Sequence, residues 1–213
     1  MYTIFITLLV FIIIVGIIYF SKSEYKIEIY DHVLTEKECN QVIQVAKKLG
    51  LKPSESFNSN TGETDETDDY RKSKTIFLED GMLSPELEQK FINIAKQFVP
   101  DAKFEEDLQV VYYKPGDYFK SHLDASDYMK DNIESDDVKV SIGRRYTLLF
   151  YLNDVDEGGE TRFININKIV QPKMGRVAFW SNLGDDGRPI QESEHEGRPP
   201  KSGEKWIVNY WIH

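Results

Sequence analysis

The chain has a single cysteine, Cys39, among its 213 residues, so no disulfide can form within it. This excludes the small secreted proteins that disulfides hold together, but it does not fix the cellular compartment. Basic residues are also scarce, because 26 Lys and Arg stand against 36 Asp and Glu, for a net charge of -10. Binding to nucleic acid needs a surplus of Lys and Arg, so we expect no nucleic-acid partner.

Charged side chains are missing from the N-terminal segment. None occurs before Lys22, and residues 4–20 are almost wholly Ile, Leu, Val and Phe. A helix of that length rises roughly 25 Å, enough to cross the hydrocarbon core of a bilayer. A cleaved signal peptide is the alternative, but no basic region precedes the run and no small-residue cleavage motif follows it. We therefore expect a transmembrane helix at 1–21 and a short linker at 22–28 in a single-pass membrane protein.

Two amphipathic helices are predicted in the first half of the chain. Thr35 and Glu38 have the spacing of a capping box, and the apolar residues that follow recur at helical spacing until Gly50. A second helix is expected to begin with Pro85 in its first turn and to end before Pro100. Both helices should lie with their apolar faces on a core.

The second half is expected to consist of short strands separated by glycine-containing turns. The expected strands are 108–113, 118–124, 145–152, 161–164, 176–180 and 205–212. Many short strands at regular spacing are typical of a β-sandwich or jelly roll. Helices followed by strands make the expected class α+β, with helical support at 29–105 and a β core at 106–213, preceded by the transmembrane helix.

His122 and Asp124 are candidate metal ligands. Side chains two residues apart in a strand point to the same face, so the imidazole and the carboxylate would project side by side. A third ligand from a distant strand would complete one face around the metal and leave other positions open for substrates, as in non-haem iron oxygenases. The pair alone is a weak signal, because a strand histidine beside a structural aspartate has the same pattern.

A second candidate group lies near the C-terminus. His195 precedes a turn rich in Gly and Pro, and Lys205 begins the apolar strand that follows. A metal-bound imidazole and a cation on adjacent strands could hold the two ends of a dicarboxylate. Alternatively, Lys205 is a lysine on an exposed strand edge, and these residues alone leave both interpretations open.

Four segments, taken together, resemble the 2-oxoglutarate- and iron-dependent prolyl 4-hydroxylases. They are QVVYYKPGDYF leading into HLD, RYTLLFYLN followed by EGGETRF, PKMG followed by AFWSN, and SGEKW followed by WI near the end of the chain. The resemblance extends from about residue 29 to the end, and the ordered occurrence of all four segments is specific. It implies a double-stranded β-helix, a jelly-roll core with a metal at one open end.

The resemblance implies roles for individual positions. His122, Asp124 and His195 match the Fe(II) ligands. Lys205 matches the residue that pairs with the distal carboxylate of 2-oxoglutarate, and Tyr113 matches a hydroxyl that binds this cosubstrate. Many related oxygenases have Arg in place of the lysine, so Lys205 favours the prolyl 4-hydroxylase branch.

Further positions match the cosubstrate and substrate sites of the family. Thr147 matches a second hydroxyl at the cosubstrate. Arg71 and Ser73 match a segment that covers the peptide substrate, and Glu106 and Trp211 are weaker candidates for the substrate cleft. The chain departs from the family at 192–194 (Glu-Ser-Glu), which is more acidic than the apolar or small residues expected there. That departure leaves the local shape and the peptide preference open.

The implied activity is hydroxylation of prolyl residues in peptides or proteins to 4-hydroxyproline. Fe(II), 2-oxoglutarate and O2 are the implied cofactor and cosubstrates, succinate is the coproduct, and L-ascorbate is expected to restore oxidised iron. The resemblance favours the endoplasmic reticulum membrane, whereas Lys22 and Lys26 favour a cytosolic catalytic part, so orientation stays open. The alternatives are an oxygenase for another residue or small molecule, a non-catalytic membrane-tethered binding module, and a zinc hydrolase, in which Lys205 and Thr147 would have no role.

Overall fold

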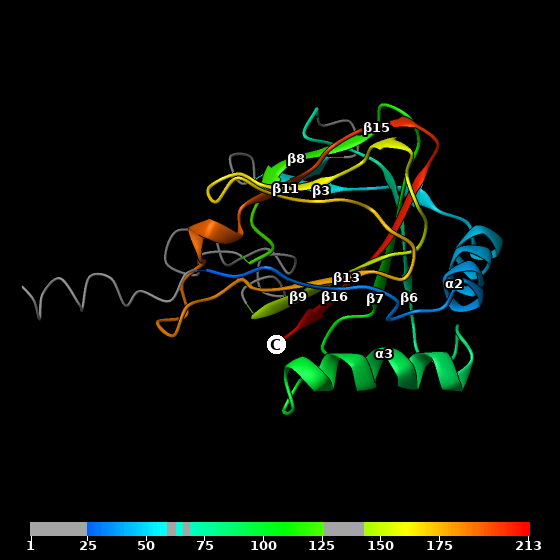
Figure 1. The fold of residues 1–213 in the computed structure, drawn as a ribbon, viewed down its shortest axis with the longest axis horizontal. Helices are drawn as coiled ribbons and strands as arrows, with labels where there is room; N and C mark the ends of the chain where they lie inside the picture. Colours follow the sequence, from blue (N-terminus) through cyan, green and yellow to red (C-terminus); the bar gives the residue numbers. More distant parts are fainter. Residues whose placement is uncertain (1–24, 59–62, 66–68, 126–142) are drawn as a thin grey trace, which may run out of the picture.

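The protein, seen in a computed structural model that describes residues 25–58, 63–65, 69–125 and 143–213, is built on two antiparallel sheets (Figure 1). The larger sheet has the order β1 (Glu28–Tyr30), β13 (Val177–Ser181), β9 (Tyr146–Tyr151), β16 (Lys205–Ile212), β7 (Leu108–Tyr113), β6 (Lys74–Leu78) and β2 (Lys52–Pro53). The smaller sheet has the order β12 (Lys168–Val170), β11 (Thr161–Phe163), β14 (His195–Gly197), β8 (Tyr118–His122) and β5 (Arg71–Lys72). Two short pairs complete the strands: β3 (Ser56–Asn58) with β4 (Glu63–Asp65), and β10 (Glu157–Gly158) with β15 (Pro200–Ser202).

The central strands of the larger sheet are buried on both faces. In β9, Leu148 and Phe150 belong to the apolar layer that contains the helices, whereas Leu149 and Tyr151 belong to a second layer with Phe163 of the smaller sheet. Successive side chains of a strand point to opposite faces, so burial of both faces requires an almost unbroken apolar run. This is why these strands could be recognised in the sequence without an alternating pattern.

Two helices, α2 (Glu36–Leu49) and α3 (Pro85–Phe98), cover the outer face of the larger sheet (Figure 1). The predicted capping box of α2 is confirmed: the backbone N–H of Glu38 donates to Oγ1 of Thr35 at 3.3 Å, and the N–H of Thr35 donates to Oε2 of Glu38 at 2.7 Å. Nζ of Lys90 in α3 donates to both oxygens of Glu38, at 2.8 and 2.6 Å. The cap therefore also joins the two helices.

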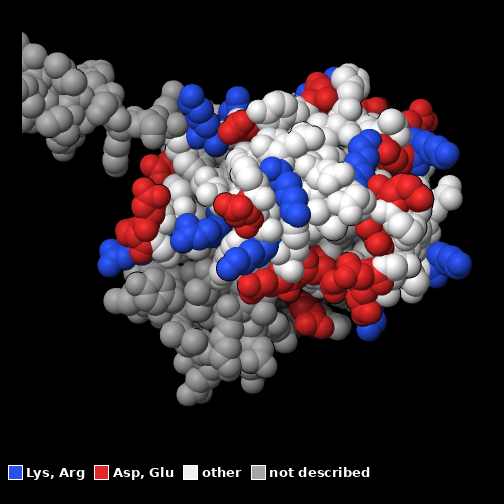
Figure 2. Space-filling view, turned by 90° about the horizontal axis from the view of Figure 1, so that it is seen from below, with Lys and Arg blue, Asp and Glu red and all other residues white. Residues whose placement is uncertain are grey.

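Charge on the α3 side of the molecule is unevenly distributed. In the view of that side, Asp and Glu side chains gather in groups, whereas Lys and Arg side chains mostly stand singly (Figure 2). This agrees with the net charge of -10. A polyanion approaching this face would meet repulsion as well as attraction.

The predicted fold class needs a correction. The jelly-roll part agrees with the two facing sheets, but the described residues are mostly strand, with two α-helices and a 3-10 turn, η1 (Gln191–Ser193), so the class α+β gave helices too much weight. Edge strands of two or three residues, such as β1, β5 and β12, were missed because so short a segment carries no periodicity. Among the described residues, no helix is long and apolar enough to cross a membrane, and the transmembrane helix predicted at 1–21 lies outside them.

The turn before β13 gives a stability prediction. Gly175 has φ +75°, its carbonyl accepts from the N–H groups of Val33 and Leu34, and a Cβ atom there would lie 2.2 Å from the carbonyl oxygen of Leu34. Gly187 has a similar φ of +74°, but a Cβ atom added to Gly187 would have no other atom within 4 Å. Gly187→Ala should lower the free energy of unfolding by about 1 kcal/mol through the left-handed backbone alone. Gly175→Ala should cost roughly 2 kcal/mol more through the backbone clash, and equal losses in urea unfolding would contradict this account.

Candidate active site

Two histidines lie opposite each other on neighbouring strands of the smaller sheet. His122 ends β8 and His195 begins β14, and the two residues are pairing partners with ring centroids 4.4 Å apart. The register shifts between His195 and Gly197, an irregularity that re-aims side chains and is common beside active sites. Asp124 lies two residues beyond the end of β8, so the third predicted ligand is close in sequence and in space.

The three predicted metal ligands come together. One nitrogen or oxygen atom from each of His122, Asp124 and His195 lies within 4.8 Å of the others. Nδ1 of His122 is 2.8 Å from the carbonyl oxygen of Lys120, and Nδ1 of His195 is 2.9 Å from that of Ser193. A carbonyl only accepts hydrogen bonds, so each Nδ1 carries the proton and each Nε2 keeps a lone pair for a metal.

The protonation states also suit a divalent metal. Burial, and then repulsion from His195, lower the pKa of His122 to about 3, so this imidazole is neutral at pH 7. Burial acts to raise the pKa of Asp124, but the two histidines and a hydrogen bond from Thr147 lower it on balance, so the carboxylate is ionised. Two imidazoles and one carboxylate on one side of a site are the donor set of non-haem Fe(II) enzymes, and the residues present therefore fit iron.

Thr147 orients the carboxylate. Its hydroxyl on β9 donates to Oδ2 of Asp124 at 2.6 Å and accepts from Nδ2 of Asn182 at 2.8 Å. Oδ1 of Asp124 lies 3.8 Å from Nε2 of His122, on the side of the metal ligands. The hydroxyl proton of Thr147 is thus engaged with Asp124, and the cosubstrate contact expected for Thr147 stays a prediction.

Aromatic rings pack closely around both imidazoles. Phe119 stacks on His122 with 3.6 Å between ring centroids and 18° between planes. Phe163 and Trp180 lie 5.4 and 5.0 Å from the ring of His195. Such a shell restricts rotation of the imidazoles and lowers the polarity around a bound metal.

Lys205 lies in the interior and not on a strand edge. It begins β16, which runs between β9 and β7, and it is 1% exposed. Its Nζ is 5.2 Å from the ring centre of Tyr113 and 5.8 Å from that of Tyr151, and the described residues provide no ion pair for it. Burial lowers the pKa of Lys205 to about 7, opposed only by attraction from Glu160. A buried amine in these surroundings favours an anionic ligand.

Tyr113 connects this lysine to two more predicted residues, Arg71 and Ser73. Tyr113 is the pairing partner of Lys205. Burial raises the pKa of Tyr113, and Arg71 together with a hydrogen bond to Ser73 acts against that rise. Nε of Arg71 donates to Oγ of Ser73 at 2.9 Å, and the guanidinium carbon lies 4.5 Å from the ring centre of Phe119, the ring that stacks on His122.

Glu106 and Trp211 meet on another side of the metal ligands, through a residue that the sequence analysis missed. Nε and Nη2 of Arg144 donate to the two oxygens of Glu106 at 2.6 and 2.5 Å, and Cζ of Arg144 lies 3.6 Å from the ring centre of Trp211. Nη1 of Arg144 also donates to the carbonyl oxygen of Asp124 at 3.4 Å. Nε2 of His213 is 3.0 Å from Glu106. Burial acts to raise the pKa of Glu106, but Arg144 and His213 lower it on balance.

The residues that the sequence analysis missed lacked a local signal. Arg144 precedes an apolar strand, His213 ends the chain, and Asn182 follows β13, with no pattern around any of them. Each gains its contact from a residue more than 30 positions away. Only the fold brings these partners together.

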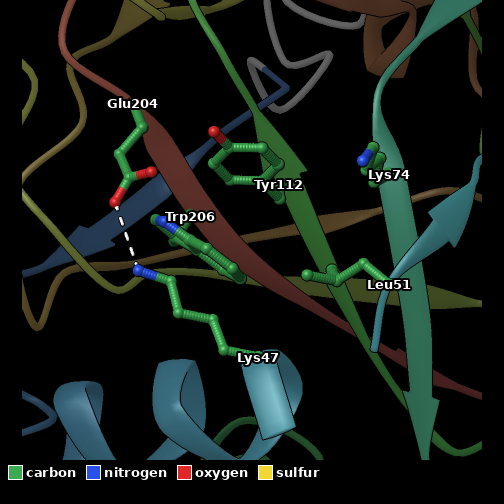
Figure 3. A pocket seen from close by; sticks show the side chains of 6 residues that line it. All are labelled: Lys47, Leu51, Lys74, Tyr112, Glu204 and Trp206. Carbon is green, nitrogen blue, oxygen red and sulfur yellow. Dashed lines mark ion pairs between the residues drawn. The ribbon is translucent and has the colours of Figure 1, made fainter. Parts of the chain in front are cut away.

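A pocket on the outer side of the larger sheet is separate from these groups (Figure 3). It is lined by Lys47, Leu51, Lys74, Tyr112, Glu204 and Trp206. Nζ of Lys47 is 3.6 Å from Glu204 and 5.0 Å from the ring centre of Trp206. Trp206 follows Lys205 in β16, so the two side chains point to opposite faces of the sheet.

Known proteins resemble this chain in sequence. The family model described as the 2OG-Fe(II) oxygenase superfamily matches residues 108–213. Human prolyl 4-hydroxylase subunit alpha-1 is 31% identical over 184 residues, which make up 86% of this chain and 34% of that protein. Prolyl 4-hydroxylase 2 of Arabidopsis thaliana is 32% identical over 212 residues, covering 87% of this chain and 66% of that protein. The chain thus spans about a third of the length of the human relative.

A solved structure extends the similarity to the fold. The viral collagen prolyl hydroxylase of Paramecium Bursaria Chlorella virus-1, crystallised as a 2OG complex, is 30% identical with a TM-score of 0.69. The match covers 89% of this chain and 96% of that one. Sequence, fold and the arrangement of the three candidate ligands agree, and the chain therefore belongs to the prolyl 4-hydroxylase family of 2OG-Fe(II) oxygenases.

Proposed function

We propose that the protein hydroxylates prolyl residues of peptides or proteins to 4-hydroxyproline in a reaction that depends on Fe(II), 2-oxoglutarate and O2. The observation that carries this proposal is the group of half-buried His122 with buried Asp124 and His195, whose ligand atoms lie within 4.8 Å of one another. The buried Lys205 nearby distinguishes the site from a plain metal-binding site. Membership of the prolyl 4-hydroxylase family supports the choice of substrate.

His122 and His195 would hold iron through Nε2, and Asp124 would hold it through Oδ1. When bound, the iron supplies the activation of O2 that couples decarboxylation of 2-oxoglutarate to hydroxylation, with succinate as coproduct. The chain's own contribution is orientation, because carbonyl contacts fix both imidazoles and Thr147 fixes the carboxylate. We include ascorbate as the reductant that returns oxidised iron to Fe(II), on the basis of the family resemblance.

Lys205 and Tyr113 would bind 2-oxoglutarate at its distal carboxylate. The ammonium lies against the ring of Tyr113, and the pKa of Tyr113 responds to Asp124 as well as to Arg71 and Ser73. The hydroxyl of Tyr113 is also near β14, the strand that begins with His195, because a Cβ atom on Gly197 would lie 3.6 Å from it. A dicarboxylate extending along Tyr113 would place its 2-oxo acid end toward the metal and its distal carboxylate at Lys205.

The prolyl peptide would lie between two groups that flank the metal ligands. Arg71 and Ser73 approach from the side of His122, through the ring of Phe119. The pair of Glu106 and Arg144, stacked on Trp211, approaches from the side of Asp124. Both groups present guanidinium N–H donors that suit peptide carbonyls.

Peptide hydroxylation tests the proposal directly. Proline-rich and collagen-like peptides incubated with the protein, Fe(II), 2-oxoglutarate and ascorbate should gain one oxygen atom at a prolyl residue, matched by one succinate. Mass spectrometry locates the oxygen, and His195→Ala provides the control without catalysis. Succinate coupled to a product other than hydroxyproline would favour a different oxygenase, and absence of 2-oxoglutarate turnover would favour a non-catalytic module.

Removal of a metal ligand should stop turnover without unfolding the protein. His122→Ala, Asp124→Ala and His195→Ala should each lower succinate formation by roughly a hundredfold or more, because even residues that only orient the ligands affect activity 10- to 100-fold. His32→Ala, at an exposed histidine outside the site, should keep wild-type activity. Near-wild-type activity in any ligand variant would contradict the metal assignment.

Lys205 should control cosubstrate affinity. An ammonium that pairs with a carboxylate in a buried site contributes about 1.5–3 kcal/mol. Lys205→Ala should therefore raise the KM for 2-oxoglutarate by roughly 10- to 100-fold at saturating iron. Lys205→Arg keeps the charge on a wider, planar group and should recover only part of the affinity. An unchanged KM in Lys205→Ala would remove this residue from the cosubstrate site.

The same lysine predicts a dependence on pH. Its pKa of about 7 means that the free protein carries the ammonium below pH 7 and loses it above. Binding of the dicarboxylate above pH 7 must then take up a proton, so the KM for 2-oxoglutarate should rise with pH, approaching tenfold per unit. In Lys205→Arg the side chain stays protonated, and the KM should vary little between pH 7 and 9. Parallel pH profiles of the two proteins would refute the assignment.

A further inference from the structure

Glu194, which precedes the metal ligand His195, joins the two strands that carry the histidines. Its Oε1 accepts a short hydrogen bond from Oγ of Ser121, the residue before His122. Its Oε2 accepts from Nδ2 of Asn165 at 3.0 Å, in the turn after β11. One carboxylate therefore contacts β8 and the turn after β11 from a position beside β14.

The backbone around this carboxylate is also fixed. The carbonyl of Glu194 accepts from the N–H of Ile164 at 3.0 Å, and its N–H donates to the carbonyl of Gln191 at 3.1 Å. Nδ2 of Asn165 donates to that same carbonyl at 2.6 Å. All the polar groups of Glu194 thus have partners, and the side chain is held in place and not solvated at random.

The carbonyls that orient the imidazoles come from residues next to this contact. The carbonyl of Lys120, the residue before Ser121, accepts from Nδ1 of His122. The carbonyl of Ser193, the residue before Glu194, accepts from Nδ1 of His195. A change in the separation of Ser121 and Glu194 would move both carbonyls. The separation of the two Nε2 atoms would change with them.

The contact is made where the pairing of β8 with β14 ends, because Glu194 is the residue before the first paired residue of β14. The backbone ladder between β8 and β14 ends at the histidine pair and shifts its register on the other side of it. Strand ends open most easily. A hydrogen bond between a hydroxyl and a carboxylate is among the stronger ones available to side chains, and here it holds that end closed.

We infer that Glu194 is a positioning residue, which through Ser121 fixes the two histidines at the separation that a metal requires. Within the acidic departure at 192–194, this role belongs to Glu194 and not to Glu192. The inference rests on the metal site of the proposed function and is independent of the peptide substrate. It goes beyond the ligands themselves, because Glu194 contacts none of the atoms that would bind the metal.

Binding of Co(II) to the metal-free full chain tests the inference without turnover. Glu194→Ala and Ser121→Ala should each raise the Kd for Co(II) by about tenfold, as loss of a residue that orients metal ligands does. The double variant should be little weaker than either single one, because both remove the same contact. Glu194→Gln keeps one acceptor for Ser121 and should recover part of the affinity. Glu192→Ala, which removes an exposed charge two residues away, should bind as the wild type does.

The visible absorption spectrum of bound Co(II) and the melting temperature of the metal-free protein separate positioning from general stability. Positioning predicts a changed spectrum and a higher Kd, whereas a purely structural role lowers the melting temperature and leaves both unchanged. Wild-type affinity in Glu194→Ala and Ser121→Ala, or losses that multiply in the double variant, would overturn the inference. Ser121→Ala removes only a hydroxyl, so the test holds even where Glu194→Ala fails to fold. Failure of the wild type to bind Co(II) would instead overturn the metal site of the proposed function.

Discussion

The pairing of β8 with β14 is the constraint on which the site depends. His122 and His195 are partners in that pairing, so the distance between two metal ligands is set by a backbone register and not by loop conformation. A slip of one residue would turn one histidine to the opposite face of the sheet and leave the metal with two ligands. The carbonyl contacts at both Nδ1 atoms and the ring of Phe119 then fix the direction of each imidazole. The positions of the two imidazoles are thus fixed by the geometry of the sheet.

The interior of the protein also holds two charged groups that are buried between the sheets. The carboxylate of Asp124 lies beside the neutral imidazole of His122 and the imidazole of His195, and the ammonium of Lys205 lies among tyrosine rings. Each group is buried with less opposite charge nearby than it would need for full compensation, and this burial costs free energy. A divalent cation at Asp124 and a dianion extending to Lys205 would compensate both charges together. The site is therefore complementary to the metal and its dicarboxylate as a pair.

The predictability of these features from sequence depends on the distance between interacting partners. The capping box joins residues three positions apart, and its prediction was confirmed. The strands 108–113 and 205–212 are long and mostly apolar, and their predicted bounds were confirmed. Most strands of two or three residues were missed, as was the five-residue strand β6 (Lys74–Leu78), and their absence from the sequence analysis made the expected class too helical. Arg144 meets Glu106 across 38 positions, and Glu194 meets Ser121 across 73. Such contacts depend on how the fold brings distant segments together. The sequence showed only that residues 192–194 are more acidic than the family pattern.

The polar residues of the central strands nevertheless indicate in the sequence which face of the larger sheet carries the site. Gln109 in β7, Thr147 in β9, and Lys205 and Asn209 in β16 interrupt otherwise apolar or aromatic runs, and all four share the strand parity of the residues that face the smaller sheet. Gln109 and Asn209 are hydrogen-bonded to each other at 2.9 Å, Thr147 donates to Asp124, and Lys205 is the residue proposed to bind the cosubstrate. The outer face of these strands packs against helices, where an uncompensated polar group would be destabilising. Polar side chains within buried strands are therefore tolerated only where partners or ligands compensate them, and here that place is the inner face.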